Sequence, residues 1–321
     1  MRMAIFPRVV LLMGPTASGK TALGIEIAKA LKGEVISVDS ALVYRGMDIG
    51  TAKPDMEERQ GIKHHLIDII DPSESFSAGQ FREQTLRLIN EVSSRGKTPV
   101  LVGGTMLYFH VLLNGIAQLP EADNTIRRQI DQQAKSSGWK ALHEQLRKID
   151  PKAANRIHQN DTQRIQRALE VYRASGKTQS AWLEEQAKQP LPFNAVKFAI
   201  VPGNRVELHH KISLRMDLML NNGFLDEVRL LFERGDLVAN MPAIRSVGYR
   251  QAWSYLEGEY DETTFREKAI IATRQLAKRQ FTWLRQQSDT MRFEMGENQA
   301  LEKVIEEFNR VDLKKRVECP N

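Results

Sequence analysis

One eight-residue segment constrains the fold of this chain more than any other feature: Gly14-Pro15-Thr16-Ala17-Ser18-Gly19-Lys20-Thr21. It matches in full the pattern G-x-x-x-x-G-K-[ST], which is typical of loops that bind two adjacent phosphates. The apolar residues 9–13 precede it and predict a buried strand, and residues 21–31 follow with helical spacing. A simple glycine turn would not require Lys-Thr at this offset, so the segment predicts a strand, a phosphate loop and a helix in succession.

The residue types of this loop indicate its chemistry. Gly14 and Gly19 allow the backbone to curl so that its N–H groups point inward, and the N-terminus of the following helix adds positive potential. Lys20 supplies a mobile cation, and the hydroxyl of Thr21 suits Mg²⁺. The sequence therefore predicts that residues 14–21 bind a diphosphate or the phosphates of a nucleotide such as ATP, with Mg²⁺ as the cofactor.

Strands and helices alternate through the first third of the sequence. The predicted residues are 34–38 (strand), 65–70 (strand), 77–93 (helix), 99–102 (strand) and 106–113 (helix). This alternation predicts a parallel, doubly wound sheet, whose ligands bind beyond the carboxyl ends of the strands. Because the phosphate loop, Asp39 and Gly103-Gly104-Thr105 all follow predicted strands, we expect them to converge on one crevice.

The chain changes character at about residue 116. From there to residue 192 no convincing strand is found, and charged helical segments dominate, such as 162–174 with Asp161 as its predicted N-cap. A strand is predicted again at 196–201, and a helix that contains Arg215 follows. The sequence thus predicts a P-loop NTPase-like α/β core formed by residues 1–115 and 193–321, with residues 116–192 as an inserted all-helical domain.

The bulk composition limits the class of protein. Hydrophobic residues make up 41% and charged residues 27% of the 321 residues, which is ordinary for a globular protein. Cys319 is the single cysteine, which excludes a disulfide within the chain and a four-cysteine zinc site. No apolar stretch approaches membrane-spanning length, so we expect a cytoplasmic enzyme that does not bind membranes. The net charge of +6 is compatible with a nucleic-acid partner.

The basic residues are concentrated on a few segments. If residues 263–286 form one helix, its predicted core face consists of Phe265, Ala269, Ala272, Leu276 and Trp283. The opposite side carries three cations and an aromatic ring, Arg274, Lys278, Arg285 and Phe281. Cations without an interleaved acid beside an aromatic ring fit an RNA backbone with a base nearby, although a solvated helix face would show the same pattern. Residues 245–250 and the donors Gln163, Arg164 and Arg167 form two more such clusters, which favours RNA.

Asp39 could cap a helix, bind Mg²⁺ or act as a general base. It ends the predicted strand 34–38, where an NTPase often has an aspartate that binds Mg²⁺. It could equally act as a general base. A hydrolysing NTPase usually has a second acid or a glutamine beside this aspartate to orient water, whereas Ser40-Ala41-Leu42 follow it here. This favours the general base, but it does not exclude the metal ligand.

Six segments together resemble the tRNA dimethylallyltransferase family, also called tRNA isopentenyltransferases. They are GPTASGKT from Gly14, VDSALVYRGMDIGTAKP from Val38, VGGTMLY from Val102, NDTQRIQRALEVY from Asn160, IRSVGYRQ from Ile244 and TRQLAKRQFTWLR from Thr273. The resemblance extends from Met13 to Arg285, and only the phosphate loop is shared widely with other families. With one cysteine, the zinc-finger tail of some eukaryotic relatives is not expected, so the chain looks like the compact bacterial form.

The resemblance implies a reaction, the transfer of the dimethylallyl group from dimethylallyl diphosphate to N6 of the adenine just 3′ of the tRNA anticodon. Lys20, the loop amides and Mg²⁺ would neutralise the departing diphosphate. Arg215 matches the family's diphosphate-binding arginine and would add a bidentate clamp. Asp39 would accept the N6 proton, and Thr105 is the third residue expected at the catalytic centre. The adenine must leave its stack to reach this crevice.

The resemblance also implies a monomer that contacts the tRNA anticodon stem-loop. The expected tRNA-binding residues are Asp39, Ser40, Ala41, Leu42, Thr105, Arg127, Gln163, Arg164, Ile165, Gln166, Arg167, Arg245, Ser246, Val247, Gly248, Tyr249, Arg250, Arg274, Lys278, Arg279, Gln280, Phe281, Thr282, Trp283, Leu284 and Arg285. Two other classes fit less well. A small-molecule kinase would use the same loop for ATP, but the chain has no obvious arginine-rich lid. A GTPase-like RNA-binding protein would need a guanine motif of the N/TKxD type, which the sequence lacks.

Overall fold

The computed structural model describes residues 6–117, 119–185, 191–287 and 289–317. The chain forms two compact units. The first consists of Met1–Leu113 with Leu191–Asn321, and the second consists of Asn114–Pro190, where the sequence placed an insert at 116–192. The first unit contains the sheet, and the regular elements described in the second unit are all helices.

Six parallel strands form the sheet, in the order β3-β2-β4-β1-β5-β6. They are β1 (Arg8–Met13), β2 (Glu34–Val38), β3 (His64–His65), β4 (Pro99–Gly103), β5 (Asn194–Val201) and β6 (Met291–Glu294). β1 lies between β4 and β5, and its last five residues are buried. A strand covered on both faces needs apolar side chains on both, which explains the uninterrupted apolar run before the phosphate loop. The predicted doubly wound α/β fold is confirmed.

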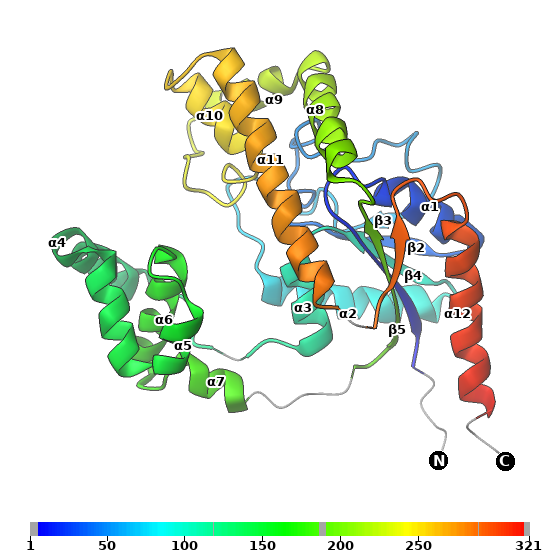
Figure 1. Ribbon diagram of the computed structural model, residues 1–321, viewed down its shortest axis with the longest axis horizontal. Helices are drawn as coiled ribbons and strands as arrows, with labels where there is room; N and C mark the ends of the chain where they lie inside the picture. Colours follow the sequence, from blue (N-terminus) through cyan, green and yellow to red (C-terminus); the bar gives the residue numbers. More distant parts are fainter. Residues whose placement is uncertain (1–5, 118, 186–190, 288, 318–321) are drawn as a thin grey trace. The chain divides into compact units, whose positions relative to one another are not determined.

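Helices cover both faces of the sheet (Figure 1). α1 (Lys20–Ala30) and α12 (Ala300–Val317) cover one face, where Ile27 and Val304 pack on strand residues such as Leu12. α2 (Ala78–Ser94) and α3 (Met106–Asn114) cover the other. α2 begins at a capping box, in which Ser77 and Gln80 each accept a hydrogen bond from the backbone N–H of the other. The two layers hold the carboxyl ends of the strands in a fixed arrangement.

Four helices form a further layer beyond the carboxyl ends of the strands (Figure 1). They are α8 (Arg205–Asn221), α9 (Phe224–Glu233), α10 (Tyr249–Leu256) and α11 (Glu262–Arg285). Phe224, Tyr249 and Phe265 form the centre of their common core. Val43, Tyr44 and Met47 belong to the same core, so the segment after β2 leaves the sheet and packs against these helices.

The second unit contains α4 (Asn124–Ile149), α5 (Pro151–Arg156), α6 (Thr162–Ser175) and α7 (Gln179–Glu185). Its core includes Ile130, Leu146, Ile165 and Leu169. α4 is interrupted at Gly138, whose φ of 81° and ψ of 156° are not helical. The predicted N-cap of α6 is confirmed, because the Asp161 carboxylate accepts a hydrogen bond from the Arg164 amide at 3.2 Å.

The strands differ from the sequence-based prediction in two places. The strand predicted at 65–70 has only two residues, His64 and His65, because Leu66 and Asp68 adopt positive φ values of 60° and 57° and turn the chain out of the sheet. β6 was not predicted, because its four residues are mostly polar or exposed. Among the helices that the structure describes, none is both long enough and apolar enough to cross a bilayer.

Candidate active site

A crevice of about 500 Å³ lies at the carboxyl edge of the sheet in the first unit. It is lined by the phosphate loop, by the residues that follow β2 and β4, and by the inner faces of α8 and α11. The predicted convergence is confirmed, since Lys20, Asp39 and Thr105 all line this one cavity. It is therefore the candidate active site.

The phosphate loop has the backbone expected of an anion site. Gly19 adopts a left-handed conformation, with φ of 81°, and α1 begins at the next residue. No side chain of the described loop caps the first turn of α1, so its amides remain available to a ligand. The Lys20 Nζ donates to the Pro15 carbonyl at 3.2 Å. Burial lowers the pKa of Lys20 to about 8, which Asp39 opposes and Arg215 reinforces.

Gln280 joins the phosphate loop to the end of β4. Its Oε1 accepts a hydrogen bond from the Thr16 amide at 2.9 Å, and its Nε2 donates to the Gly104 carbonyl at 2.9 Å. The side chain is 8% exposed. A Cβ at Gly104 would lie 2.5 Å from Nε2, so the glycine is needed for this approach. Gln280 was expected to contact tRNA, but its side chain is occupied in fixing the crevice.

Asp39 and Thr105 are held by local hydrogen bonds at the ends of β2 and β4. The Asp39 carboxylate is half-buried and accepts from the Ala41 amide at 2.8 Å. The Thr105 Oγ1 accepts from the Ser40 amide at 3.0 Å, which ties the two strand ends together. Asp39 keeps a free acceptor capacity toward the crevice, because a carboxylate has two oxygens and several lone pairs.

Arg215 approaches the crevice from α8. Its guanidinium is half-buried and donates to the Thr51 carbonyl at 3.2 Å. Burial lowers the pKa of Arg215, and Asp39 opposes the shift. Two cations and one carboxylate, Lys20, Arg215 and Asp39, thus influence one another inside the crevice. An arrangement with an excess of positive charge suits an anion that carries several charges, such as a diphosphate.

The residues around the loop also suit Mg²⁺. The crevice offers the hydroxyl of Thr21 and the carboxylate of Asp39, which are hard oxygen donors. Among the described residues no group of three His, Cys, Asp or Glu side chains could form a complete protein cage for a metal. Mg²⁺ commonly keeps waters and binds through one or two protein oxygens together with substrate phosphates, so this donor set fits it.

A second cavity, of about 340 Å³, lies between α8 and α11 and is called the α8–α11 groove here. Its lining residues are Pro202, Arg205, Leu208, His209, Ile271, Arg274, Gln275, Ala277, Lys278, Phe281, Thr282 and Arg285. No acidic side chain is among these described lining residues. Arg274 donates to Ser213 Oγ at 3.2 Å, and the Arg285 guanidinium lies 4.6 Å from the centre of the Phe281 ring. The predicted basic side of residues 263–286 is therefore one wall of a groove.

The prediction for the opposite side of α11 was partly wrong. Leu276 and Trp283 are half-buried and line the crevice, whereas Ala277 and Leu284 are buried in the core. The projection missed this because the C-terminal half of α11 lines a cavity on each of two sides, which a projection of the sequence cannot show. Leu284, 1% exposed, was expected to contact tRNA, and its burial contradicts that expectation.

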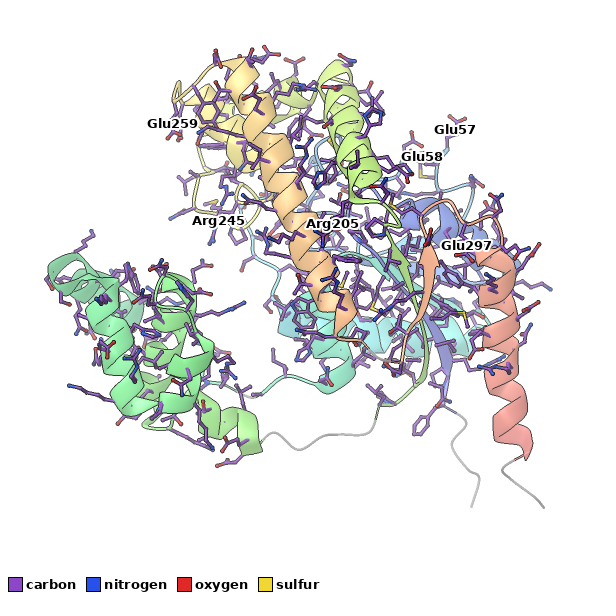
Figure 2. All side chains as sticks on the ribbon, viewed as in Figure 1. Glu57, Glu58, Arg205, Arg245, Glu259 and Glu297 are labelled. Atoms are coloured by element: carbon purple, nitrogen blue, oxygen red, sulfur yellow. The ribbon has the colours of Figure 1, made fainter. Side chains whose placement is uncertain are left out.

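Burial also contradicts side-chain contacts with tRNA for two other expected residues. Tyr249 is fully buried, and its hydroxyl donates to Glu227. Ile165 lies in the core of the second unit. Arg245 and Arg250 are exposed, and Ser246, Val247 and Gly248 line the crevice. Arg205 lies in the α8–α11 groove, whose described lining contains no acidic side chain. Arg205 and Arg245 belong to different segments of the first unit (Figure 2).

In the second unit, some of the expected tRNA-binding residues are exposed, and others form contacts within the unit. Gln163 and Arg164 are exposed. Arg127 and Arg167 both form ion pairs with Glu170, whose side chain is fully buried. Gln166, also expected to contact tRNA, donates a hydrogen bond to the Asp131 carboxylate at 2.7 Å. Burial alone would raise the pKa of Glu170, but the hydrogen bonds from the two arginines lower it. These arginines therefore have a structural task, and their contact with tRNA stays a prediction.

Sequence reasoning missed several residues that line the crevice or hold its border in place. Glu227 of α9 holds the loop of residues 48–50, and nothing in its local sequence indicates this role. Ile212, Met216 and Met219 of α8 form an apolar wall. Their spacing of three and four residues is a signal of one helix face, but it does not tell a cavity wall from a core.

Comparison with known proteins gives consistent results. Residues 42–287 match the model of a family described as IPP transferase. The chain is 55% identical over 296 residues to a tRNA dimethylallyltransferase of Methylococcus capsulatus, which covers 92% of this chain and 95% of that protein. It is 53% identical over 307 residues to a tRNA dimethylallyltransferase of Coxiella burnetii, covering 96% and 99%.

Solved structures are similar over most of the chain. The crystal structure of a tRNA isopentenylpyrophosphate transferase from Bacillus halodurans has a TM-score of 0.71 at 38% identity and covers 97% of this chain and 99% of that one. A eukaryotic dimethylallyltransferase acting on tRNA has a TM-score of 0.77 at 28% identity, covering 93% and 78%.

Proposed function

This chain belongs to the IPP transferase family, and from that membership we propose how its crevice modifies tRNA. It is an enzyme that transfers a dimethylallyl group to tRNA. Dimethylallyl diphosphate is the donor, and N6 of the adenine directly 3′ of the anticodon is the acceptor. The observation that carries this proposal is that Lys20, Arg215 and Asp39 meet in one crevice at the edge of a parallel sheet.

The two cations serve the leaving group. As the bond between the dimethylallyl carbon and the diphosphate oxygen breaks, the electron pair stays on the oxygen and negative charge grows there. Lys20 and Arg215 approach this position from α1 and α8, and the free amides at the start of α1 add further donors. Groups that are already in place when the charge develops stabilise the transition state more than solvent could.

The apolar wall of the crevice fits the dimethylallyl group. Ile212, Met216 and Met219 are at most 8% exposed, and Leu276 lies with them in the crevice lining. A short, branched hydrocarbon gains free energy when such side chains remove it from water. The flexible methionines can adapt to its shape. This wall also excludes water, which would otherwise compete with the adenine for the donor.

Asp39 supports the acceptor. The N6 amine of adenine is a weak nucleophile because its lone pair is delocalised into the ring. When the lone pair forms a bond to the dimethylallyl carbon, the nitrogen must lose one proton, and the Asp39 carboxylate accepts it. Thr105 fixes the adjoining backbone through Ser40. Proton removal by a positioned base contributes about 10²–10⁴-fold to such a step.

Mg²⁺ is proposed as the cofactor. Thr21 would hold it, with Asp39 as the alternative protein ligand and the diphosphate oxygens completing the contact. When bound, the ion would neutralise charge on the diphosphate. In that arrangement Lys20 and Arg215 still orient the diphosphate, and the apolar wall still orients the dimethylallyl group.

The tRNA surfaces are proposed to be the exposed basic segments. They are the α8–α11 groove, the exposed Arg245 and Arg250, and Gln163 with Arg164 on the second unit. Phosphate contacts from such side chains position the RNA, while the flipped adenine enters the crevice. We further propose that the enzyme acts as a monomer in the cytoplasm.

The test is the transfer reaction itself. The protein is incubated with dimethylallyl diphosphate, Mg²⁺ and an anticodon stem-loop RNA, and the digested nucleosides are analysed by mass. We expect one adenosine to gain one dimethylallyl group, and no product when guanine replaces that adenine. Product on other adenines would contradict the proposed acceptor. Replacing the donor by labelled ATP tests the kinase alternative, for which a labelled phosphorylated product would be required.

A further inference from the structure

The loop of residues 44–53 borders the crevice, but the proposed reaction does not explain what the loop does. Gly50, Thr51 and Ala52 line the cavity directly. The loop follows β2 and packs against the helical layer rather than the sheet. A backbone segment at a binding site must be held in place, because loops without such support have low local stability.

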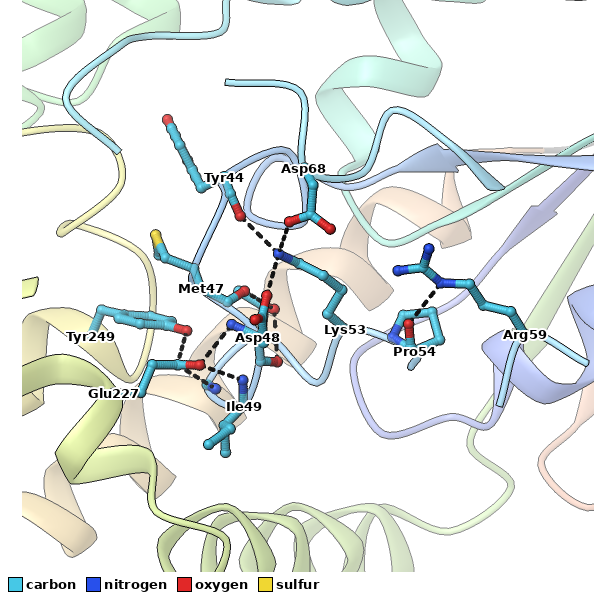
Figure 3. Close-up of polar contacts among 12 residues, drawn as sticks. Tyr44, Met47, Asp48, Ile49, Lys53, Pro54, Arg59, Asp68, Glu227 and Tyr249 are labelled. Carbon is cyan, nitrogen blue, oxygen red and sulfur yellow. Dashed lines mark hydrogen bonds and ion pairs between the residues drawn. The ribbon is translucent and has the colours of Figure 1, made fainter. Parts of the chain in front are cut away.

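One side of this loop is fixed by Lys53. Its Nζ donates to the Tyr44 carbonyl and pairs with the carboxylates of Asp48 and Asp68 (Figure 3). The Lys53 side chain is only 4% exposed. The Thr51 hydroxyl closes the loop further by donating to the Met47 carbonyl at 2.7 Å. Apart from the pair with Asp68, these contacts all lie within residues 44–53.

The other side is fixed by a residue distant in sequence, Glu227 of α9. Its Oε2 accepts from the amides of Asp48 and Ile49, both at 2.7 Å, and its Oε1 accepts from the Gly50 amide at 3.1 Å (Figure 3). The Tyr249 hydroxyl donates to the same carboxylate. One carboxylate thus binds three consecutive amides, which fixes the direction of the backbone at this point.

The contact between loop and helices is close. A Cβ on Gly50 would lie 2.1 Å from the Phe224 ring and 2.7 Å from the Tyr249 ring. Burial raises the pKa of Tyr249, and the neighbouring Glu227 adds to this, so the hydroxyl remains a donor across the working pH range. The loop, Glu227 and Tyr249 therefore form one rigid contact.

The residue after these three amides is Thr51, whose carbonyl accepts the hydrogen bond from Arg215 at 3.2 Å. We propose that Glu227 is a positioning residue for the diphosphate site: by binding the amides of residues 48–50 it fixes the Thr51 carbonyl, which orients the Arg215 guanidinium. This inference rests on the proposed role of Arg215 toward the diphosphate. Glu227 itself is not expected to touch either substrate.

The experiment compares Glu227→Gln with Asp226→Asn, a control on the same helix whose exposed carboxylate pairs only with Arg229 among the contacts described. Glutamine cannot accept from three amides without placing its own N–H₂ against a donor. We expect the KM for dimethylallyl diphosphate to rise about tenfold and kcat/KM to fall about 10- to 100-fold, as for other displaced catalytic groups. The KM for tRNA and all constants of the control should stay unchanged.

A double-mutant cycle separates positioning from general stability. In an Arg215→Lys background, Glu227→Gln should change kcat/KM by less than about twofold, because the group that it positions is no longer there to be displaced. The proposal would be overturned if Glu227→Gln lowered kcat only by the fraction of protein that is unfolded and left the KM for dimethylallyl diphosphate unchanged. Fully multiplicative effects of the two substitutions would overturn it as well.

Two further measurements keep the outcomes distinct. If Glu227→Gln does not fold, Tyr249→Phe removes one of the four donors and should raise the donor KM about threefold, a typical effect of one hydrogen bond. An unchanged KM would then contradict the proposal. Binding of inorganic pyrophosphate is measured in all variants, and wild-type protein that binds pyrophosphate but transfers no dimethylallyl group would refute the proposed function alone.

Discussion

The two sides of α11 differ in composition and in their proposed roles. The crevice side carries Gln280, Leu276 and Trp283, which hold or line the catalytic cavity. The groove side carries Arg274, Lys278 and Arg285, which form a cationic wall around Phe281. Because neighbouring residues in a helix point in directions about 100° apart, one continuous segment can serve both. The comparison shows that one basic helix can have a structural face and a binding face at the same time.

If the two sides of α11 are independent, substitutions in the crevice should impair the reaction with dimethylallyl diphosphate and leave the affinity for tRNA unchanged. The largest effect is expected from Lys20→Ala, which removes the cation of the phosphate loop. Turnover should fall about 10³-fold, as when a central oxyanion donor is lost. Transfer kinetics and tRNA binding are measured in parallel. If tRNA affinity fell as much as turnover, the separation of the two sides would be broken.

Asp39→Asn sharpens the role of the carboxylate on the crevice side. The substitution preserves size but removes the proton acceptor, so kcat should fall about 10²-fold or more with little change in donor affinity. The measurement is steady-state kinetics over a Mg²⁺ series. A loss of Mg²⁺ dependence together with weaker diphosphate binding would instead assign Asp39 as a metal ligand.

Gln280→Leu tests α11 itself. It would leave the Thr16 amide and the Gly104 carbonyl without their partner, which costs about 1–3 kcal/mol of unfolding free energy for each buried group left unpaired. The donor KM should rise about tenfold, because the phosphate loop loses its tether. Gln275→Leu, on the groove side of the same helix, is the matched control. Equal donor KM values for both variants would contradict the role given to Gln280.

The pH dependence offers a test without a large structural change. Since the pKa of Lys20 is lowered to about 8, its cation is lost as the pH rises through that value. The kcat/KM for the donor should then fall, approaching tenfold per pH unit. In Lys20→Arg this alkaline decline should disappear, because arginine stays charged. A decline that persists in this variant would have to come from another group.

The smallest effect concerns the groove side. Replacing Lys278 and Arg285 by glutamine should reduce the slope of log tRNA affinity against log salt by about 2, roughly one per lost phosphate contact. Both side chains are exposed, so circular dichroism should show a folded protein. The paired control is Lys32→Gln with Arg87→Gln, exposed cations elsewhere on the first unit. If the slope of log tRNA affinity against log salt were the same as in that control, the groove would be a solvated surface that does not bind tRNA.

Much of the fold could be predicted because its signals are local. The phosphate loop, β2 and the capped start of α6 are specified by contiguous residues, and the structure reproduces them. Glu227 and Gln280 could not be assigned, because their partners are distant in sequence and are brought near only by the fold. The strand expected at 65–70 failed for a related reason. Leu66 adopts a positive φ that its residue type does not favour, so tertiary contacts decide the turn.

The position of β1 has a consequence for the way in which this chain folds during synthesis. β1 pairs on one side with β4 and on the other with β5, and the whole second unit lies between these two partners in sequence. The second unit closes its core from contiguous residues, which favours rapid folding. The open edge of β1 must wait until residues 194–199 have left the ribosome. During this interval an unpaired apolar strand edge is exposed, and this is when the nascent chain is most prone to pair wrongly or aggregate.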